Sequence, residues 1–103
     1  MITFNIAIIG GGNLGRSIAE GLIESGKIKP GHITITRRKV HLIEDLKAQG
    51  VEVGEDNLKA IRNKRVIILA VKPHQAEKVI REILPDLKKD QILISVVTGF
   101  SIN

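Results

Sequence analysis

Three glycines near the amino terminus have the spacing of a phosphate-binding turn. Gly10, Gly12 and Gly15 follow an apolar run and are followed at once by a helical pattern. In such a G-x-G-x-x-G turn, the first glycine lets the chain leave a strand sharply, the second leaves room for a diphosphate, and the third allows close helix–sheet packing. The N–H groups at the helix start then face the anion. The stretch predicts a dinucleotide site, and the alternative is an ordinary glycine-rich turn without a ligand.

A basic stretch at the end of the second expected strand bears on which dinucleotide binds. An NAD site usually carries Asp or Glu there, which accepts a hydrogen bond from the ribose 2′-hydroxyl. Here Thr36, Arg37, Arg38 and Lys39 follow one another, and the first acidic residue after them is Glu44. A guanidinium group grips phosphate oxygens in pairs, and a threonine hydroxyl adds a donor. The stretch therefore favours NADP(H) over NAD, and the alternative is a solvated basic loop.

Apolar runs and helical periodicities alternate along the chain. Strands are expected at residues 4–9, 32–36, 51–53, 65–71 and 91–97. Helical patterns are expected at residues 13–25, 40–49 and 56–61 and from Pro73 to Pro85. Within these patterns Leu14, Leu42 and Leu84 are expected to face the core, and Asp56 is the better candidate for a helix cap.

This alternation with short connections predicts an α/β fold. We expect a Rossmann-type doubly wound parallel sheet in strand order 3-2-1-4-5, with helices on both faces and a crevice between the first and fourth strands. The 103 residues form one domain. A full dinucleotide fold has a sixth strand, and an enzyme needs a wall for its substrate. We expect both to lie outside this chain, and an apolar edge beside the fifth strand would then favour self-association.

The composition sets limits on other functions. The chain has no cysteine, a net charge of +5, and Phe4 and Phe100 as its aromatic residues. We expect no cysteine-ligated metal, and we expect His32, His41 and His74 at the surface. Because the basic residues are spread out and lack aromatic neighbours, nucleic-acid binding is disfavoured. The sequence shows no signal peptide and no run that would cross a membrane, which favours a cytoplasmic protein.

Several stretches together resemble the amino-terminal domain of pyrroline-5-carboxylate reductase, and the resemblance covers essentially the whole chain. They are Ile8 to Gly15 with Ala19, Gly21 and Leu22; Thr36-Arg37-Arg38; Asn57; Ala70-Val71-Lys72-Pro73; and Ser95-Val96-Val97-Thr98-Gly99. The chain departs from the family pattern at Leu14, often methionine, and at Val97-Thr98, often small residues.

The resemblance implies an activity. Enzymes of this family reduce 1-pyrroline-5-carboxylate to L-proline with NAD(P)H, in proline biosynthesis. Their carboxy-terminal helical domain forms the dimer and supplies much of the substrate site. By resemblance, this chain is the cofactor domain of a homo-oligomeric enzyme and is catalytically incomplete alone, so no catalytic residue is assigned. Two alternatives stay open: a related reductase, such as a deazaflavin-dependent NADP reductase or a 3-hydroxyacid dehydrogenase, or a non-catalytic NADP-binding module.

The motifs and the resemblance together give a set of cofactor-binding candidates. They are Gly10, Gly12, Asn13, Leu14, Gly15, Thr36, Arg37, Arg38, Asn57, Val71, Lys72, Pro73, Thr98 and Gly99. The resemblance implies that Asn57 contacts the ribose or a phosphate, although a role in a turn or cap is equally open. It places 71–73 along the crevice near the adenosine ribose and diphosphate, and Thr98 and Gly99 near the nicotinamide.

Overall fold

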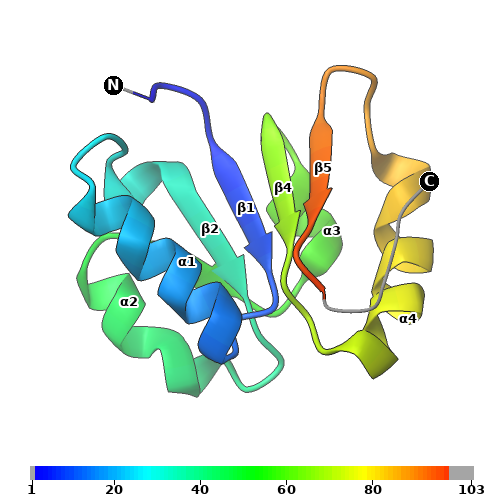
Figure 1. Cartoon of the computed structure of the whole chain (residues 1–103), viewed down its shortest axis with the longest axis horizontal. Coiled ribbons are helices and arrows are strands. Elements are labelled where there is room, and N and C mark those ends of the chain that lie inside the picture. Colours follow the sequence, from blue (N-terminus) through cyan, green and yellow to red (C-terminus); the bar gives the residue numbers. More distant parts are fainter. Residues whose placement is uncertain (1, 98–103) are drawn as a thin grey trace.

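A computed structural model describes residues 2–97 of the chain. Five parallel strands form one sheet in the order β3-β2-β1-β4-β5 (Figure 1), which confirms the expected topology. The strands are β1 (Ile6–Ile9), β2 (Ile33–Thr36), β3 (Glu52–Gly54), β4 (Val66–Leu69) and β5 (Ile92–Ser95). Four of them are slightly shorter than their sequence patterns indicated, and β3 has the expected three residues one position later. Among the described residues, no helix is long and apolar enough to cross a lipid bilayer.

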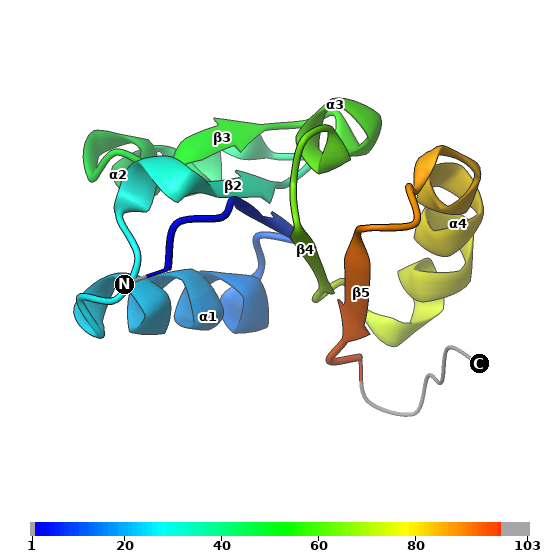
Figure 2. The ribbon, with the colours of Figure 1, turned by 90° about the horizontal axis from the view of Figure 1, so that it is seen from above.

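Helices cover both faces of the sheet, as expected for a doubly wound fold (Figure 2). They are α1 (Asn13–Glu24), α2 (Glu44–Ala48), α3 (Asn57–Ile61) and α4 (Pro73–Ile83), with short 3₁₀ segments η1 (Pro30–His32), η2 (Val40–Ile43) and η3 (Leu84–Asp86). Since side chains alternate along a strand, β1 feeds two cores. Ile6 and Ile8 pack with the α1–α2 side, and Ala7 and Ile9 pack with the α3–α4 side.

The register of β1 with its two neighbouring strands locates the candidate site at one edge of the sheet. Ile9, the last residue of β1, is level with Thr36 of β2 and with Leu69 of β4. The carboxyl ends of these three strands therefore lie at one edge, and the direction of strand addition reverses between β1 and β4. Ligands of open α/β sheets bind at this switch point. The glycine turn, the basic stretch and the segment beginning at Ala70 all follow strands that end here.

Three leucines expected in the core are exposed instead. The exposed fractions are 48% for Leu14, 44% for Leu42 and 53% for Leu84. Leu42 is exposed because the expected helix over 40–49 begins as the 3₁₀ segment η2, whose tighter winding changes which side chains face the sheet. Leu84 lies after the end of α4, in η3 around Pro85. Leu14 lies beside the buried face of α1, which is centred on Gly15 and Ala19.

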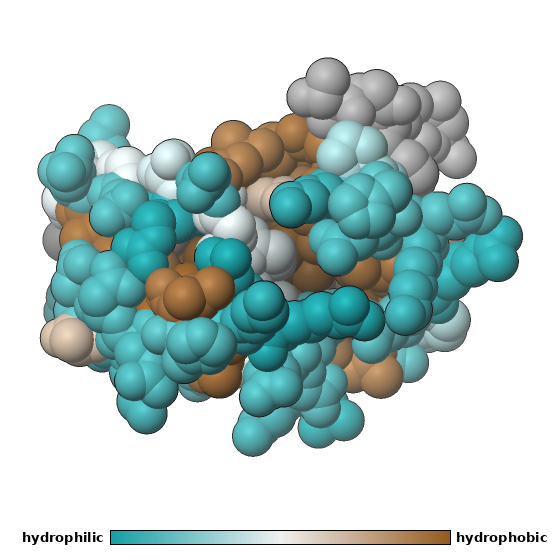
Figure 3. All heavy atoms as spheres, turned by 90° about the horizontal axis from the view of Figure 1, so that it is seen from below, coloured by the Kyte–Doolittle hydropathy of each residue, from teal (hydrophilic) through white to brown (hydrophobic). Residues whose placement is uncertain are grey.

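The face of β5 on the α1 side is uncovered in the described part of the chain. Ile92 and Ile94 are exposed and pair in register with Val66 and Ile68 of β4. Figure 3, which views the molecule from the carboxyl ends of the strands, shows hydrophobic atoms near the top of the view. The expected exposed apolar surface is therefore present, and self-association through it stays a prediction.

Candidate dinucleotide-binding site

Gly10 makes the tight turn out of β1. Its φ is +109°, and a Cβ atom there would lie 2.8 Å from the backbone nitrogen of Val71 and 2.9 Å from the carbonyl oxygen of Ala70. Its own N–H donates to the Thr36 carbonyl oxygen at 3.2 Å. Glycine is required here on two counts, since an L side chain would be both strained and in collision. The turn thereby joins the ends of β1, β2 and β4.

Gly15 brings α1 directly against the turn. A Cβ at this position would lie 1.8 Å from the Gly10 carbonyl oxygen and 3.3 Å from Cγ2 of Ile8. Ala19, one helical turn further on, is fully buried against the same side of the sheet. The close helix–sheet packing expected from the glycine spacing is therefore present.

Gly12 lies in open space. A Cβ there would have no protein atom within 4 Å, judged over the described residues. Gly12 is the N-cap of α1 in extended conformation, and among residues 2–97 no side chain caps the helix or adds an acid to its first turn. The first-turn N–H groups and the space above Gly12 are thus available to an anion.

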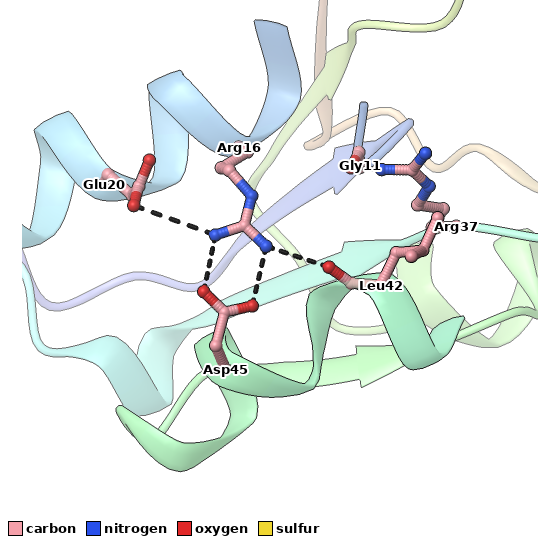
Figure 4. A network of polar contacts seen from close by, with 6 residues as sticks. All are labelled: Gly11, Arg16, Glu20, Arg37, Leu42 and Asp45. Atoms are coloured by element: carbon pink, nitrogen blue, oxygen red, sulfur yellow. Dashed lines mark hydrogen bonds and ion pairs between the residues drawn. The ribbon is translucent and has the colours of Figure 1, made fainter. Parts of the chain in front are cut away.

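Gly11 has a structural role that the motif does not assign. It is buried, and a Cβ there would lie 3.2 Å from both the Arg37 Cβ and the Thr36 carbonyl oxygen. Arg37 Nη1 donates to the Gly11 carbonyl oxygen at 2.9 Å (Figure 4). The basic loop after β2 therefore lies directly on the glycine turn. The sequence signal was the third glycine in the run 10–12, which the G-x-G-x-x-G spacing leaves unexplained.

Thr36 and Asn57 meet beneath this loop. The buried Thr36 hydroxyl donates to Asn57 Oδ1 at 2.7 Å, and Asn57 Nδ2 donates to Glu82 Oε1 at 2.9 Å. Asp56 caps α3 as expected, because its Oδ1 accepts from the N–H groups of Leu58 and Lys59. Asn57 is therefore not the cap. It links β2 to α3 and α4 at the site edge.

The remaining candidates lie around the same edge. Arg38 is exposed, and among residues 2–97 its guanidinium makes no hydrogen bond or ion pair. Val71 is half-buried across the switch point from Gly10, and the exposed Lys72 is the N-cap of α4, which begins at Pro73 as expected. Thr98 and Gly99 lie outside the described residues.

An ion pair that the sequence analysis did not predict borders the site. Arg16 of α1 donates to both carboxylate oxygens of Asp45 at 2.6 Å and to the Leu42 carbonyl oxygen at 2.9 Å (Figure 4). The hydrogen bonds from Arg16 hold the pKa of Asp45 below its usual value, and the bond to Asp45 raises the pKa of Arg16. The two residues are 29 positions apart, so no local pattern links them.

The glycine turn, the switch point and the uncapped helix start define a Rossmann-type dinucleotide-binding domain. The chain belongs to the family described as NADP oxidoreductase, coenzyme F420-dependent, which matches residues 5–99. It is 42% identical over 100 residues to pyrroline-5-carboxylate reductase 2 of Dictyostelium discoideum, covering 96% of this chain and 33% of that protein.

Solved structures agree with the sequence relatives. A pyrroline-5-carboxylate reductase from Coxiella burnetii has a TM-score of 0.89 and 38% identity, covering 97% of this chain and 37% of that one. The Plasmodium falciparum pyrroline carboxylate reductase with NADP bound has a TM-score of 0.84 and 25% identity, covering 99% and 36%. The resemblance seen in the motifs is confirmed. The chain spans about a third of the length of the relatives it matches.

Proposed function

We propose that this chain binds NADP(H) and is the cofactor domain of a pyrroline-5-carboxylate reductase. The observation that best supports this proposal is the contact between the glycine turn and the basic loop, in which Arg37 Nη1 donates to the Gly11 carbonyl oxygen at 2.9 Å. This contact joins the turn before α1, where we propose that the diphosphate binds, to a strand end that carries arginine and no acid. The similarity to the Plasmodium falciparum enzyme with NADP bound supports the same choice of coenzyme.

The residues present fit a diphosphate at the start of α1. Gly12 leaves open space above the turn, and the first helical turn holds no side-chain cap among the described residues. N–H groups from 12–14 are the proposed donors to the phosphate oxygens. Asn13 and Leu14, both exposed, border the same space. Among the described residues, no acidic side chain lies in the first turn of α1, where it would repel the anion.

The adenosine end is assigned to the loop after β2. Arg37 is engaged with Gly11, so Arg38, which is exposed, is the proposed ligand of a 2′-phosphate. Thr36 and Asn57, which bond to one another, form the floor under the ribose. A hydrogen bond to a charged group contributes about 1.5–3 kcal/mol, so one such contact gives about tenfold or more in affinity. On this basis we propose that the chain prefers NADPH over NADH.

The crevice wall and the nicotinamide end complete the proposal. Val71, Lys72 and Pro73 lie across the switch point from Gly10 and are proposed to line the diphosphate and adenosine ribose. Thr98 and Gly99 are proposed to lie near the nicotinamide. When bound, the reduced nicotinamide supplies a hydride to the imine carbon of 1-pyrroline-5-carboxylate. The contribution of this chain is to hold the coenzyme in place and to fix its orientation.

The activity proposed for the whole enzyme is the NADPH-dependent formation of L-proline. The relatives are about three times as long as this chain, so we propose that further segments of a longer protein supply the substrate wall and any catalytic acid. We further propose that this enzyme is a homo-oligomer and acts in the cytoplasm in proline biosynthesis. On this proposal, the 103-residue chain binds NADPH without turning over 1-pyrroline-5-carboxylate.

Calorimetric titration of the chain with NADPH and with NADH, at fixed pH and ionic strength, tests the coenzyme assignment. We expect NADPH to bind at least about tenfold more tightly, and Arg38→Ala to remove most of that difference without weakening NADH. Arg62→Ala is the matched control, because it removes the same charge from an exposed site in the segment before β4. Equal affinities for the two coenzymes would overturn the NADP assignment, and binding of neither would overturn the function.

A further inference from the structure

Arg16 connects the glycine turn to η2 and α2, the two segments that follow the basic loop. It lies in α1 one helical turn after Gly12, and its backbone N–H donates to the Gly12 carbonyl oxygen at 2.9 Å. Its side chain reaches Asp45 through two contacts of 2.6 Å and the Leu42 carbonyl oxygen through one of 2.9 Å (Figure 4). A guanidinium with three such bonds has one position relative to both elements.

The partners of Arg16 lie immediately beyond the basic loop. Leu42 belongs to η2, which starts at Val40 directly after Lys39, and Asp45 belongs to α2. At its other end the loop is fixed by the sheet, because the backbone N–H of Arg37 donates to the Gly54 carbonyl oxygen at 2.9 Å. The segment 37–39 is thus held from both sides, and the side chains of 38 and 39 are exposed between these two anchors.

We propose that Arg16 and Asp45 are positioning residues of the coenzyme site: their ion pair fixes the loop 37–39 against the glycine turn and thereby sets the preference for a phosphorylated adenosine. The proposal rests on the proposed function, because it concerns the same site. Neither residue needs to touch the coenzyme. Their effect passes through Leu42 and the start of η2 to the guanidinium of Arg38.

The competing explanation is an ion pair with no role beyond the surface. The side chains are 26% and 58% exposed for Arg16 and Asp45, and exposed pairs usually contribute little to stability. The two explanations predict opposite signs for one variant. If only charge mattered, Asp45→Asn would free Arg16 to attract a nearby phosphate and NADPH would bind more tightly. If the pair positions the loop, the same variant weakens NADPH.

The experiment measures the dissociation constants of NADPH and NADH for the wild-type chain, Asp45→Asn, Arg16→Gln and the double variant, at one ionic strength. We expect each single variant to weaken NADPH about three- to tenfold, as part of a charge-assisted contact is lost, and to change NADH by less than about twofold. The double variant should be no weaker than the singles, since the second substitution removes a link that is already broken.

Two further variants separate positioning from general loss of an ion pair. Arg16→Lys keeps the charge and one donor, so an intermediate NADPH affinity is expected. Arg81→Gln removes the ion pair between Arg81 and Glu77 on α4, at 2.5 Å, and should leave the ratio of the two affinities unchanged. An unchanged or increased NADPH preference in Asp45→Asn would overturn the proposal. Absence of NADPH binding to the wild-type chain would overturn the proposed function instead.

Discussion

The glycine turn and the basic loop meet at one edge of the sheet, but different forces fix their shapes. The turn is fixed by backbone sterics, because a Cβ at Gly10 or Gly15 would collide with main-chain atoms. The loop is fixed by side-chain contacts between different elements, namely Arg37 to Gly11 and Arg16 to Asp45. Changes in the turn should therefore alter the fold or the space for a ligand, whereas changes in the loop should alter coenzyme choice.

The largest expected effect is at Gly15. In Gly15→Ala the new Cβ would lie 1.8 Å from the Gly10 carbonyl oxygen, so α1 must move away from β1. Overpacking of this severity is expected to lower the free energy of unfolding by about 3 kcal/mol or more. Urea denaturation measures it. The control is Gly21→Ala on the same helix, where a Cβ meets no described atom within 4 Å, and which should be neutral or stabilising. Equal stability of the two variants would contradict the steric account.

This division explains how much of the molecule the sequence predicts. The strand order and the requirement for Gly10 and Gly15 follow from alternation and from the contact rules of the backbone, which leave a periodic or spaced signature. Asp56 as a cap was predictable for the same reason, because the acceptor and its two donors are neighbours in the chain. Each of these features leaves its signal in the residue types and spacing of short stretches, so the sequence carries it.

The features that the sequence does not predict lie in and around the basic loop after β2. The 3₁₀ winding of η2 exposes Leu42, although the residue types suit a helix from 40 onward. The contacts Arg16–Asp45 and Arg37–Gly11 join residues 29 and 26 positions apart. Such partners are chosen by the packing of α1 and α2 on the sheet, and a pattern of residue types does not specify them.

A substitution at Gly12 sharpens the comparison, because it changes the turn without altering the fold. The φ of Gly12 is −75°, a value that alanine adopts, and a Cβ there meets no protein atom within 4 Å over the described residues. Gly12→Ala should therefore unfold close to the wild-type denaturant midpoint, with a small loss because alanine is a poorer N-cap than glycine, and it should fill the space proposed for the diphosphate. NADPH and NADH should both weaken by about tenfold or more, in contrast to loop variants, which affect NADPH selectively. Calorimetry checks both affinities, and wild-type affinity would contradict the placement of the diphosphate.

A substitution at Arg37 tests whether the loop depends on its contact with the turn. Arg37→Ala removes the bond to the Gly11 carbonyl oxygen and leaves that buried residue without this partner. The free energy of unfolding should fall by about 1 kcal/mol, the usual net contribution of one hydrogen bond. Binding of NADPH should weaken more than binding of NADH, because Arg38 loses its support.

Arg38→Ala is the comparison: it should weaken NADPH binding without changing the stability of the fold. If Arg37→Ala and Arg38→Ala behaved alike in both measurements, the distinction between Arg37, which holds the loop on the turn, and Arg38, the proposed ligand of the 2′-phosphate, would be wrong.

The smallest expected effect is the pH dependence of the stability contributed by the Arg16–Asp45 ion pair. The hydrogen bonds from Arg16 lower the pKa of the Asp45 carboxyl, so this carboxyl stabilises the fold above its unfolded pKa and loses that contribution as the pH falls through its folded pKa. Wild type should therefore melt above Asp45→Asn near neutral pH, and the gap should close below about pH 4. Glu20 is also a carboxylate near Arg16, but at the longer distance of 3.8 Å, so Glu20→Gln is the control and should give a smaller gap. Thermal melts of the three proteins from neutral to acidic pH measure this, and since both carboxylates are exposed, added salt should shrink the gap as well. A gap that stayed constant with pH would contradict a stabilising role for the charge of Asp45.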